Sequence, residues 1–431
     1  MTNIVLISVD DLRLDCLSCF NDISKLEKYG ITKDMVYTPT MDFLAEDGQF
    51  FPNAYAPASY TPSSHASMLT GVYPNKHKTV TFFSGMTKSY PTLPQMLSSN
   101  GYFNIAWVEH PTFETQRITR GFNLVFEPLE GDEDMYIEDV FDNNIVGKNN
   151  FFFFHLFDVH KPYYYETGGA DRISQNNGSY IPRIKRICDR HDISLFDLSE
   201  RALEEVNRIG GYNSFPYALQ ELAYFRAFDF ALREKLKEDN SLLEEMVKLY
   251  VEGVSLFDCS KLANLIVKLE EYDPEVKIIL TSDHGEMEHN GNFCNSPSVS
   301  EEAIRIPLIT KGFPVSKHPK RLCSLVDIVP TILDAAGVNV PSVLDGYALN
   351  TLPYERQIFT DSWALEKIEG GVFTAIANLE SSPRNENLVA ARTIGHLGDA
   401  VYIDGAYIGD EGAFPALKGY LDKYEDKLGW F

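Results

Sequence analysis

The stretch IVLISVDD, at residues 4–11, is typical of a strand that is buried in a parallel β-sheet. Its first six residues are largely apolar and mostly β-branched, as expected of a strand that is covered on both faces. Two aspartates, Asp10 and Asp11, follow at once, at the carboxyl end of the strand. Because ligands of open α/β sheets bind beyond such strand ends, the stretch predicts both a fold and the place of a site.

Three later runs have the same character, at residues 151–157, at 276–281 and, more weakly, at 304–309. Helical patterns lie between them, for example at residues 92–100 and 241–270. Strands that alternate with helices indicate a doubly wound α/β fold. We therefore expect a largely parallel sheet that is flanked by helices.

The character of the sequence changes twice along the chain. Residues 168–240 are polar, charged and aromatic, with helical patterns, and are interpreted as an insertion that either caps a substrate pocket or is a plain surface excursion. After residue 346, short runs separated by Gly, Asn and Pro lead to a polar helix at residues 416–427. We expect a catalytic domain over residues 1–346 and a small C-terminal α+β subdomain over residues 347–431.

The composition disfavours several classes of partner. With 38 basic and 62 acidic residues the formal charge is −24, which repels nucleic-acid backbones and anionic lipid headgroups. A small anionic substrate would therefore need a locally positive pocket. No apolar run reaches the length of a membrane span, no signal peptide is visible, and the six scattered cysteines do not resemble a secreted disulfide framework. We expect a cytoplasmic protein, whose oligomeric state stays open.

Acidic residues follow a second predicted strand as well. Asp283 and His284 come directly after the run at 276–281 and its Ser282, and they offer a hard and a borderline ligand for a divalent ion. Adjacent carboxylates such as Asp10 and Asp11 repel each other unless a cation lies between them. Taken alone, that pair is better explained by a helix N-cap and a surface acid. Two acidic strand ends in one chain favour a shared metal site.

The stretch TPSSHASMLTG, at residues 61–71, predicts a short helix with a hydroxyl group at its start. Pro62 suits the first helical position, so Thr61 would lie at the amino terminus of the helix. There the backbone N–H groups and the helix dipole favour a tetrahedral anion and, with a metal nearby, the alkoxide of Thr61. Taken alone, Thr61 is better explained as an ordinary N-cap threonine.

An ordered series of segments closely resembles the sulfatase family of the alkaline phosphatase superfamily. The matching segments lie at residues 4–11, 38–45, 61–71 with 73–74, 160–163, 282–286, 304–308 and 327–331. The resemblance implies an alkaline-phosphatase-like fold and one divalent metal ion as cofactor. The implied metal ligands are Asp10, Asp11, Thr61, Asp283 and His284.

By the same resemblance, His160 lies beside the substrate and donates to its leaving group or oxyanion. His160 also follows a buried strand, where a general acid is needed. The alternative is a structural histidine that is hydrogen-bonded to its own loop. His155, inside the apolar run, is better interpreted as a core histidine.

The chain departs from the sulfatase pattern at the nucleophile. Sulfatases carry a cysteine or serine there, converted to formylglycine, in a Cys-x-Pro-x-Arg setting. This chain has Thr61, then Ser63 in place of the proline and His65 in place of the arginine. Threonine cannot become formylglycine, so none is expected. Two lysines of the family are also missing, one from residues 294–302 and one from the stretch Glu109-His110.

A threonine at this position resembles phosphonoacetate hydrolases, nucleotide phosphodiesterases and phosphoethanolamine or phosphoglycerol transferases. Their chemistry is in-line displacement at phosphorus through a covalent threonine intermediate. His65, His110 and His289 are candidates to replace the missing cations as substrate-binding donors, although surface or structural roles explain each of them equally well.

We favour one metal ion over two. A second metal would need a further trio of ligands, for which Asp158, His160 and His396 are the only obvious candidates. Asp158 and His160 are two residues apart, whereas two-metal families usually place this pair four apart. Three carboxylates with one imidazole suit Mn²⁺, Zn²⁺, Ca²⁺ or Mg²⁺.

The leading hypothesis is a metal-dependent hydrolase of phosphate or phosphonate esters that acts through a covalent Thr61 intermediate. One alternative is a transferase that moves a phosphate-linked headgroup to a sugar or polyol. Another is a sulfuric ester hydrolase with unusual chemistry. A non-catalytic descendant that binds an anion or a protein partner is the last alternative, and the retained acidic residues argue against it.

Overall fold

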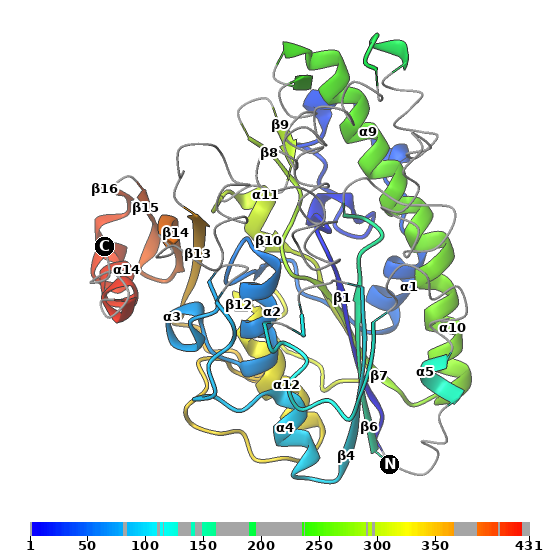
Figure 1. Cartoon of the computed structure of the whole chain (residues 1–431), viewed down its shortest axis with the longest axis vertical. Helices are drawn as coiled ribbons and strands as arrows, with labels where there is room; N and C mark the ends of the chain where they lie inside the picture. The colour runs from blue at the N-terminus through cyan, green and yellow to red at the C-terminus, as the bar shows by residue number, and fades with distance from the viewer. Residues whose placement is uncertain are drawn as a thin grey trace, which may run out of the picture.

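The centre of the computed structural model is a seven-stranded sheet with helices on both faces (Figure 1). The structure describes residues 2–80, 84–109, 113–114, 116–127, 139–142, 149–160, 189–194, 235–236, 238–289, 292–294, 298–365, 386–403 and 406–424. The strands of the central sheet are β1 (Ile4–Val9), β2 (Gln49–Phe50), β4 (Tyr102–Val108), β5 (Leu124–Phe126), β6 (Asn149–Leu156), β7 (Lys277–Ser282) and β11 (Leu308–Lys311).

The strand order in this sheet is β2-β11-β7-β1-β6-β4-β5. Strands β7, β1, β6, β4 and β5 run parallel, and β11 is antiparallel to both of its neighbours. The largely parallel α/β sheet that the sequence predicts is confirmed, and β1 has the predicted bounds.

The remaining strands form smaller sheets. These are β3 (Ala54–Tyr55), β10 (Arg305–Ile306) and β12 (Cys323–Ser324) in one sheet, β8 (Met287–His289) and β9 (Asn292–Cys294) in a second, and β13 (Gln357–Leu365), β14 (Glu386–Gly395), β15 (Gly398–Ile403) and β16 (Ala406–Gly409) in a third. The α-helices of the described residues are α1 (Pro39–Asp47), α2 (Thr61–Thr70), α3 (Pro74–His77), α4 (Leu93–Ser98), α5 (Asp139–Asp142), α9 (Asn240–Phe257), α10 (Ala263–Tyr272), α11 (Glu301–Ile304), α12 (Ile328–Ala335) and α14 (Phe414–Leu421).

The side chains of β1 alternate between two cores. Val5, Ile7 and Val9 lie in one cluster with residues of α1, α9 and α10, whereas Ile4 and Leu6 lie in another with residues of α2, α4 and α12. Figure 1 shows α9 and α10 on one side of the sheet and α2, α4 and α12 on the other. This burial explains the unbroken apolar run, because a strand that is covered on both faces has no solvent side.

The helical pattern at residues 241–270 forms two helices, α9 and α10, that are joined by a π-helical turn at Asp258–Leu262. The side chain of Asp239 caps the first turn of α9. The weak run at residues 304–309 divides at Pro307 into β10 and β11, which belong to different sheets. Proline has no N–H group for a strand ladder, so it separates the two pairings.

The C-terminal strands β13 to β16 form an antiparallel sheet on which α14 packs. Tyr73 and Val326 join the core of this unit and so attach it to the main body. Leu349 and Leu352, just beyond the expected boundary at residue 346, pack into the main core instead. The α+β character of the unit is confirmed, whereas nearly all of the expected insertion at 168–240 lies outside the described residues.

No helix in the described part of the chain is long and apolar enough to cross a membrane. Cys16, Cys19, Cys259 and Cys323 are free thiols. The CxxC pair formed by Cys16 and Cys19 therefore holds no disulfide.

Candidate active site

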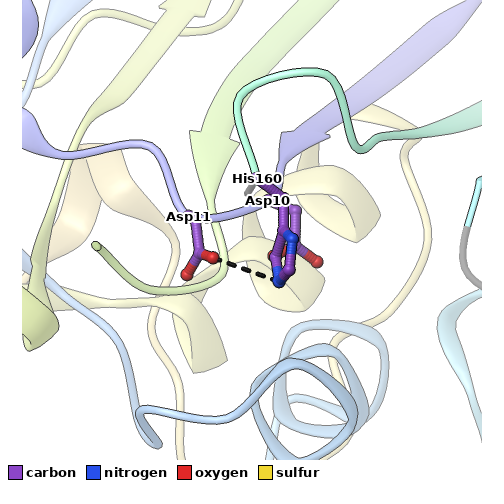
Figure 2. Close-up of side chains that lie close together, drawn as sticks. All are labelled: Asp10, Asp11 and His160. Atoms are coloured by element: carbon purple, nitrogen blue, oxygen red, sulfur yellow. Dashed lines mark ion pairs between the residues drawn. The ribbon is translucent and has the colours of Figure 1, made fainter. Parts of the chain in front are cut away.

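Asp10 and Asp11 lie at the end of β1 and direct their carboxylates into one space with His160 (Figure 2). Neighbouring residues of a strand normally face opposite sides. Asp11 leaves that pattern because its backbone is left-handed, with a φ of 60°, a conformation that aspartate tolerates better than most residues. One ligand atom from each of the three side chains lies within 4.8 Å of the others.

Three hydrogen bonds hold the backbone of Asp11 in this conformation. Its N–H group donates to Asp283 Oδ1 at 3.3 Å. Its carbonyl oxygen accepts the hydroxyl of Tyr250 at 2.7 Å and the N–H group of Glu286 at 3.2 Å. Helix α9 and the segment after β7 therefore fix the turn that follows β1.

Asp283 and His284 follow β7, which is a neighbour of β1 in the sheet. His284 Nδ1 lies 2.8 Å from Asp11 Oδ1, and its Nε2 lies 3.3 Å from Asp283 Oδ2. Gly285 comes next, and a Cβ atom there would lie 2.2 Å from the carbonyl oxygen of Glu302. Only glycine allows this close passage of two backbones.

Thr61 is the first residue of α2, and its hydroxyl oxygen lies 3.1 Å from His284 Nε2. The N-cap residue of the helix is Tyr60, which excludes the ordinary N-cap explanation of Thr61. The first N–H groups of this ten-residue helix have no acceptor within the helix and favour an anion at this end. The hydroxyl of Thr61 thus lies between a helix amino terminus and the ends of β1 and β7.

His160 belongs to the turn that follows β6. Its Nε2 lies 3.3 Å from Asp11 Oδ2, the pair marked in Figure 2. Its ring stacks on that of Phe157, with centroids 4.0 Å apart and ring planes 17° apart. His160 is 6% exposed, so its imidazole is held almost out of solvent. This placement suits either a proton donor or a further ligand of a cation.

Three fully buried carboxylates, Asp10, Asp11 and Asp283, form what we call the acidic cluster. Burial raises the pKa of Asp10, and the charges of Asp283 and Asp11 raise it further. Burial alone would lower the pKa of His284, but the charges of Asp283 and Asp11 outweigh it and raise this pKa to about 10. Buried negative charge of this density is favourable only when a cation neutralises it.

The acidic cluster and His284 fit a divalent cation. One ligand atom from each of Asp10, Asp283 and His284 lies within 4.8 Å of the others. Asp10 Oδ1 is buried and, within the described residues, accepts no hydrogen bond. A buried carboxylate oxygen without a donor is available as a metal ligand, and carboxylates with one imidazole suit Mn²⁺, Zn²⁺, Ca²⁺ or Mg²⁺.

His65 does not occupy the place predicted for a substrate-binding donor. It is fully buried, its Nδ1–H donates to the carbonyl oxygen of Thr61 at 2.7 Å, and its Nε2 lies 2.9 Å from Ser8 Oγ. Its ring centroid lies 4.8 Å from that of Phe113. Burial lowers the pKa of His65, which favours the neutral ring. The residue joins the start of α2 to β1 from within the core.

For two of the other predicted histidines the structure gives no side-chain position. His110 lies outside the described residues, and His289 is described only as backbone of β8. His396 lines a separate cavity of about 310 Å³ beside the C-terminal sheet, together with residues such as Tyr73 and Asn75. It joins neither group of possible metal ligands found among the described residues. The trio considered for a second metal is therefore not assembled.

His155 has a role that the sequence does not indicate. It is a buried residue of β6, as its apolar surroundings predict, but its Nε2 also lies 3.0 Å from Asp10 Oδ2. The available signal is strand register, because His155 pairs with Ser8, two residues before Asp10. A partner of this kind orients a carboxylate that binds a metal.

Lys261, in the π-helical turn, is a second residue that the sequence does not single out. Its Nζ lies 2.7 Å from Asp158 Oδ2 and 2.5 Å from Glu109 Oε1. Asp158 is thereby engaged in an ion pair two residues from His160. No local pattern distinguishes Lys261 from a solvent-facing lysine of a helix.

Comparison with known proteins identifies a matching family and related sequences. The family model described as Sulfatase matches residues 2–338. Arylsulfatase K of Xenopus laevis is 24% identical over 360 residues, covering 74% of this chain and 62% of that protein. N-acetylglucosamine-6-O-sulfatase of Bacteroides thetaiotaomicron is 23% identical over 404 residues, covering 80% of this chain and 70% of that protein. The chain thus spans less than two thirds of the Xenopus protein.

Solved structures share the fold of this chain. A protein in complex with its substrate D-glucosamine-2-N,6-O-disulfate has a TM-score of 0.59 at 17% identity, over 99% of this chain and 98% of that one. The phosphonate monoester hydrolase of Silicibacter pomeroyi has a TM-score of 0.56 at 17% identity, over 99% of this chain and 95% of that one. The alkaline-phosphatase-like fold expected from the sequence is confirmed. Because the family match covers most of its length, the chain belongs to the sulfatase family, which depends on a divalent metal ion.

Proposed function

We propose that the chain is a metal-dependent hydrolase of phosphate or phosphonate esters, with Thr61 as its nucleophile. The observation that carries the proposal is the 3.1 Å contact of Thr61 Oγ1 with His284 Nε2 at the amino terminus of α2. A hydroxyl group in this place meets both the positive end of a helix and the residues that fit a cation.

The acidic cluster and His284 would hold a divalent cation, which would lower the pKa of the Thr61 hydroxyl and offset negative charge on the substrate. Thr61 Oγ1, as the alkoxide that remains after its proton has passed to solvent, attacks phosphorus on the side opposite the leaving oxygen, and the bond from phosphorus to that oxygen breaks. The first N–H groups of α2 bind the other oxygens around phosphorus. His160 donates a proton to the leaving oxygen. In the second step, a water molecule gives a proton to His160 and cleaves the bond between phosphorus and Thr61.

Two features support phosphorus over sulfur as the reacting centre. Threonine cannot be converted to formylglycine, so Thr61 acts as a plain alkoxide. Glu109 stands in the stretch where the sequence pattern of sulfatases has a lysine, and its carboxylate is paired with Lys261. At Glu109 itself, the described residue of that stretch, a carboxylate therefore stands where the family pattern has a cation for the sulfate group.

Sulfate-ester hydrolysis is the second candidate. It is favoured by the relatives, which include an arylsulfatase K and an N-acetylglucosamine-6-O-sulfatase. It would require Thr61 to act on sulfur without the modified residue of the family pattern, and this requirement places it second.

The test is a turnover screen with 4-nitrophenyl esters of phosphate, phenylphosphonate and sulfate and with bis(4-nitrophenyl) phosphate, after reloading with Mn²⁺, Zn²⁺, Ca²⁺ or Mg²⁺. We expect a phosphorus ester to be the best substrate. Thr61→Ala should lower kcat/KM by about 10³-fold or more. Ser63→Ala, two residues along the same helix, is the matched control and should retain activity. Equal turnover by wild type and Thr61→Ala would end the proposal, and a preference for the sulfate ester would support the second candidate.

A further inference from the structure

The turn that carries His160 is held by contacts beyond β6. The N–H group of His160 donates to the carbonyl oxygen of Phe157 at 3.1 Å, and the N–H group of Phe157 donates to Glu109 Oε2 at 2.9 Å. The two rings of Phe157 and His160 are stacked. The orientation of His160 therefore depends on Phe157, and the position of Phe157 depends on Glu109.

Lys261 bridges two carboxylates around this turn. Its Nζ lies 2.5 Å from Glu109 Oε1 and 2.7 Å from Oδ2 of Asp158, the residue after Phe157. The side chains of Glu109 and Asp158 are only 6% and 3% exposed, and that of Lys261 is 19% exposed. Solvent screens such ion pairs weakly, and removal of the cation leaves two buried negative charges side by side.

The π-helical turn Asp258–Leu262 places Lys261 at the carboxyl ends of β4 and β6. Asp258, the first residue of the turn, is fully buried and accepts the N–H groups of Thr40 and Met41 at the start of α1. The turn is thus anchored at one end while it presents a lysine at the other. π-helical turns within longer helices are frequent at functional sites.

We propose that Lys261 is a positioning residue whose ion pairs with Glu109 and Asp158 fix the turn at residues 157–160, so that His160 stays against Asp11 and protonates the leaving group. The inference rests on the proposed function, because that function gives His160 a proton to transfer. It assigns a task to the α9–α10 connection, which supplies neither the nucleophile nor the acidic cluster.

Substrate binding explains Lys261 less well. One positive and two negative charges leave the group of Lys261, Glu109 and Asp158 net negative, so it does not attract an anionic ester. Two of the three N–H donors of the ammonium group are already taken by carboxylates. Lys261 instead links the residues that follow β4 and β6, Glu109 and Asp158.

The first test compares Lys261→Met and Lys261→Arg with the wild type on two substrates. These are the phenyl ester and the 4-nitrophenyl ester of the phosphorus or sulfur acid whose ester is turned over best in the screen. A general acid matters most for the poorer leaving group, phenol. We expect Lys261→Met to lower kcat about 10-fold or more for the phenyl ester, less than about threefold for the 4-nitrophenyl ester, and to leave KM unchanged. Lys261→Arg keeps the charge and should retain most of the activity. Lys268→Met, which removes a half-exposed lysine of α10, is the matched control.

A double-mutant cycle with His160→Gln separates positioning from a general loss of function. His160→Gln should show the same dependence on the leaving group, and adding Lys261→Met should lower kcat by less than about twofold more. A full further loss in that background, or a raised KM with unchanged kcat, would overturn the proposal. The Thr61→Ala comparison tests the proposed function separately. If Lys261→Met behaves as the wild type does, the proposed function therefore still stands.

A crystal structure of Lys261→Met gives a readout that does not need turnover. We expect the turn at 157–160 to be displaced and His160 Nε2 to have left Asp11 Oδ2. An unmoved turn would overturn the proposal even if no substrate were found. Should Lys261→Met fail to fold, Glu109→Gln serves the same tests, because it keeps an acceptor for the N–H group of Phe157 but removes the charge that pairs with Lys261.

Discussion

His155 Nε2 lies 3.0 Å from Asp10 Oδ2, across the boundary between two neighbouring strands of the central sheet. Both side chains are fully buried. One oxygen of Asp10 is therefore held by the protein, while the other, Oδ1, accepts no hydrogen bond in the part of the chain that the structure describes. A carboxylate held in this way cannot rotate freely, so its second oxygen keeps a fixed direction toward a cation.

His155→Phe should weaken metal binding by about 10- to 100-fold, because Asp10 loses the partner that orients it. The measurement is a calorimetric titration of chelator-treated protein with Mn²⁺. His396→Phe, in the cavity beside the C-terminal sheet, is the control and should bind as the wild type does. If His155→Phe binds Mn²⁺ as tightly as the wild type, His155 has no part in orienting Asp10.

Asp10→Asn should act in opposite directions with and without metal. Burial, Asp283 and Asp11 raise the pKa of Asp10 above its unfolded value, so the ionised carboxylate weakens folding at neutral pH when no cation is present. The substitution should therefore raise the midpoint of thermal unfolding in chelator and abolish the further rise that Mn²⁺ gives to the wild type. Thermal unfolding with chelator and with Mn²⁺ measures both. A variant less stable than the wild type in chelator would contradict the electrostatic account.

Asp361 predicts a pH dependence of stability in the C-terminal unit. It is fully buried and accepts the hydroxyl groups of Tyr420, at 2.8 Å, and Tyr424. Burial raises the pKa of Asp361 to about 6, although the hydrogen bonds from Tyr424 and Tyr420 oppose it. The folded pKa of Asp361 therefore exceeds its unfolded value of 3.8. The contribution of protonated Asp361 to the stability of the fold is complete below pH 3.8 and is lost as the pH rises through about 6.

Asp361→Asn removes this titration. Its free energy of unfolding relative to the wild type should therefore increase between pH 4 and pH 7, by about 3 kcal/mol at most. Urea unfolding of both proteins at the two pH values gives the difference. Asp334→Asn, at an exposed position, is the control and should show no such change. An equal difference at both pH values would mean that Asp361 titrates as it does in the unfolded chain.

The central strand and the acids behind it could be predicted because their signals are local. Two-sided burial requires the unbroken apolar run of β1, and parallel strands place Asp10 and Asp283 at the same edge of the sheet. The helix that begins at Thr61 was also predictable from Pro62. The sequence predicted Pro62 as the first helical residue, whereas the helix begins one residue earlier, at Thr61.

The contacts between distant segments had no such signal. Lys261 reaches Asp158 across 103 residues, and nothing near it in the sequence marks it as buried. His65 would have the same sequence pattern whether it faced a substrate or bonded to Ser8 within the core. The apolar pattern does not indicate β4, because Asn104 interrupts it; that side chain is buried and donates to the carbonyl oxygen of Pro94.

The most direct measurement of the central claim is the mass of the intact protein, quenched in acid during turnover of the best ester. We expect the wild type to gain the mass of the phosphoryl or phosphonyl group that is transferred from the ester. The masses of peptide fragments should locate this group on Thr61. Thr61→Ala should gain nothing under the same conditions. Turnover by the wild type with the added mass on another residue, or an equal adduct on Thr61→Ala, would contradict the assignment of Thr61 as nucleophile.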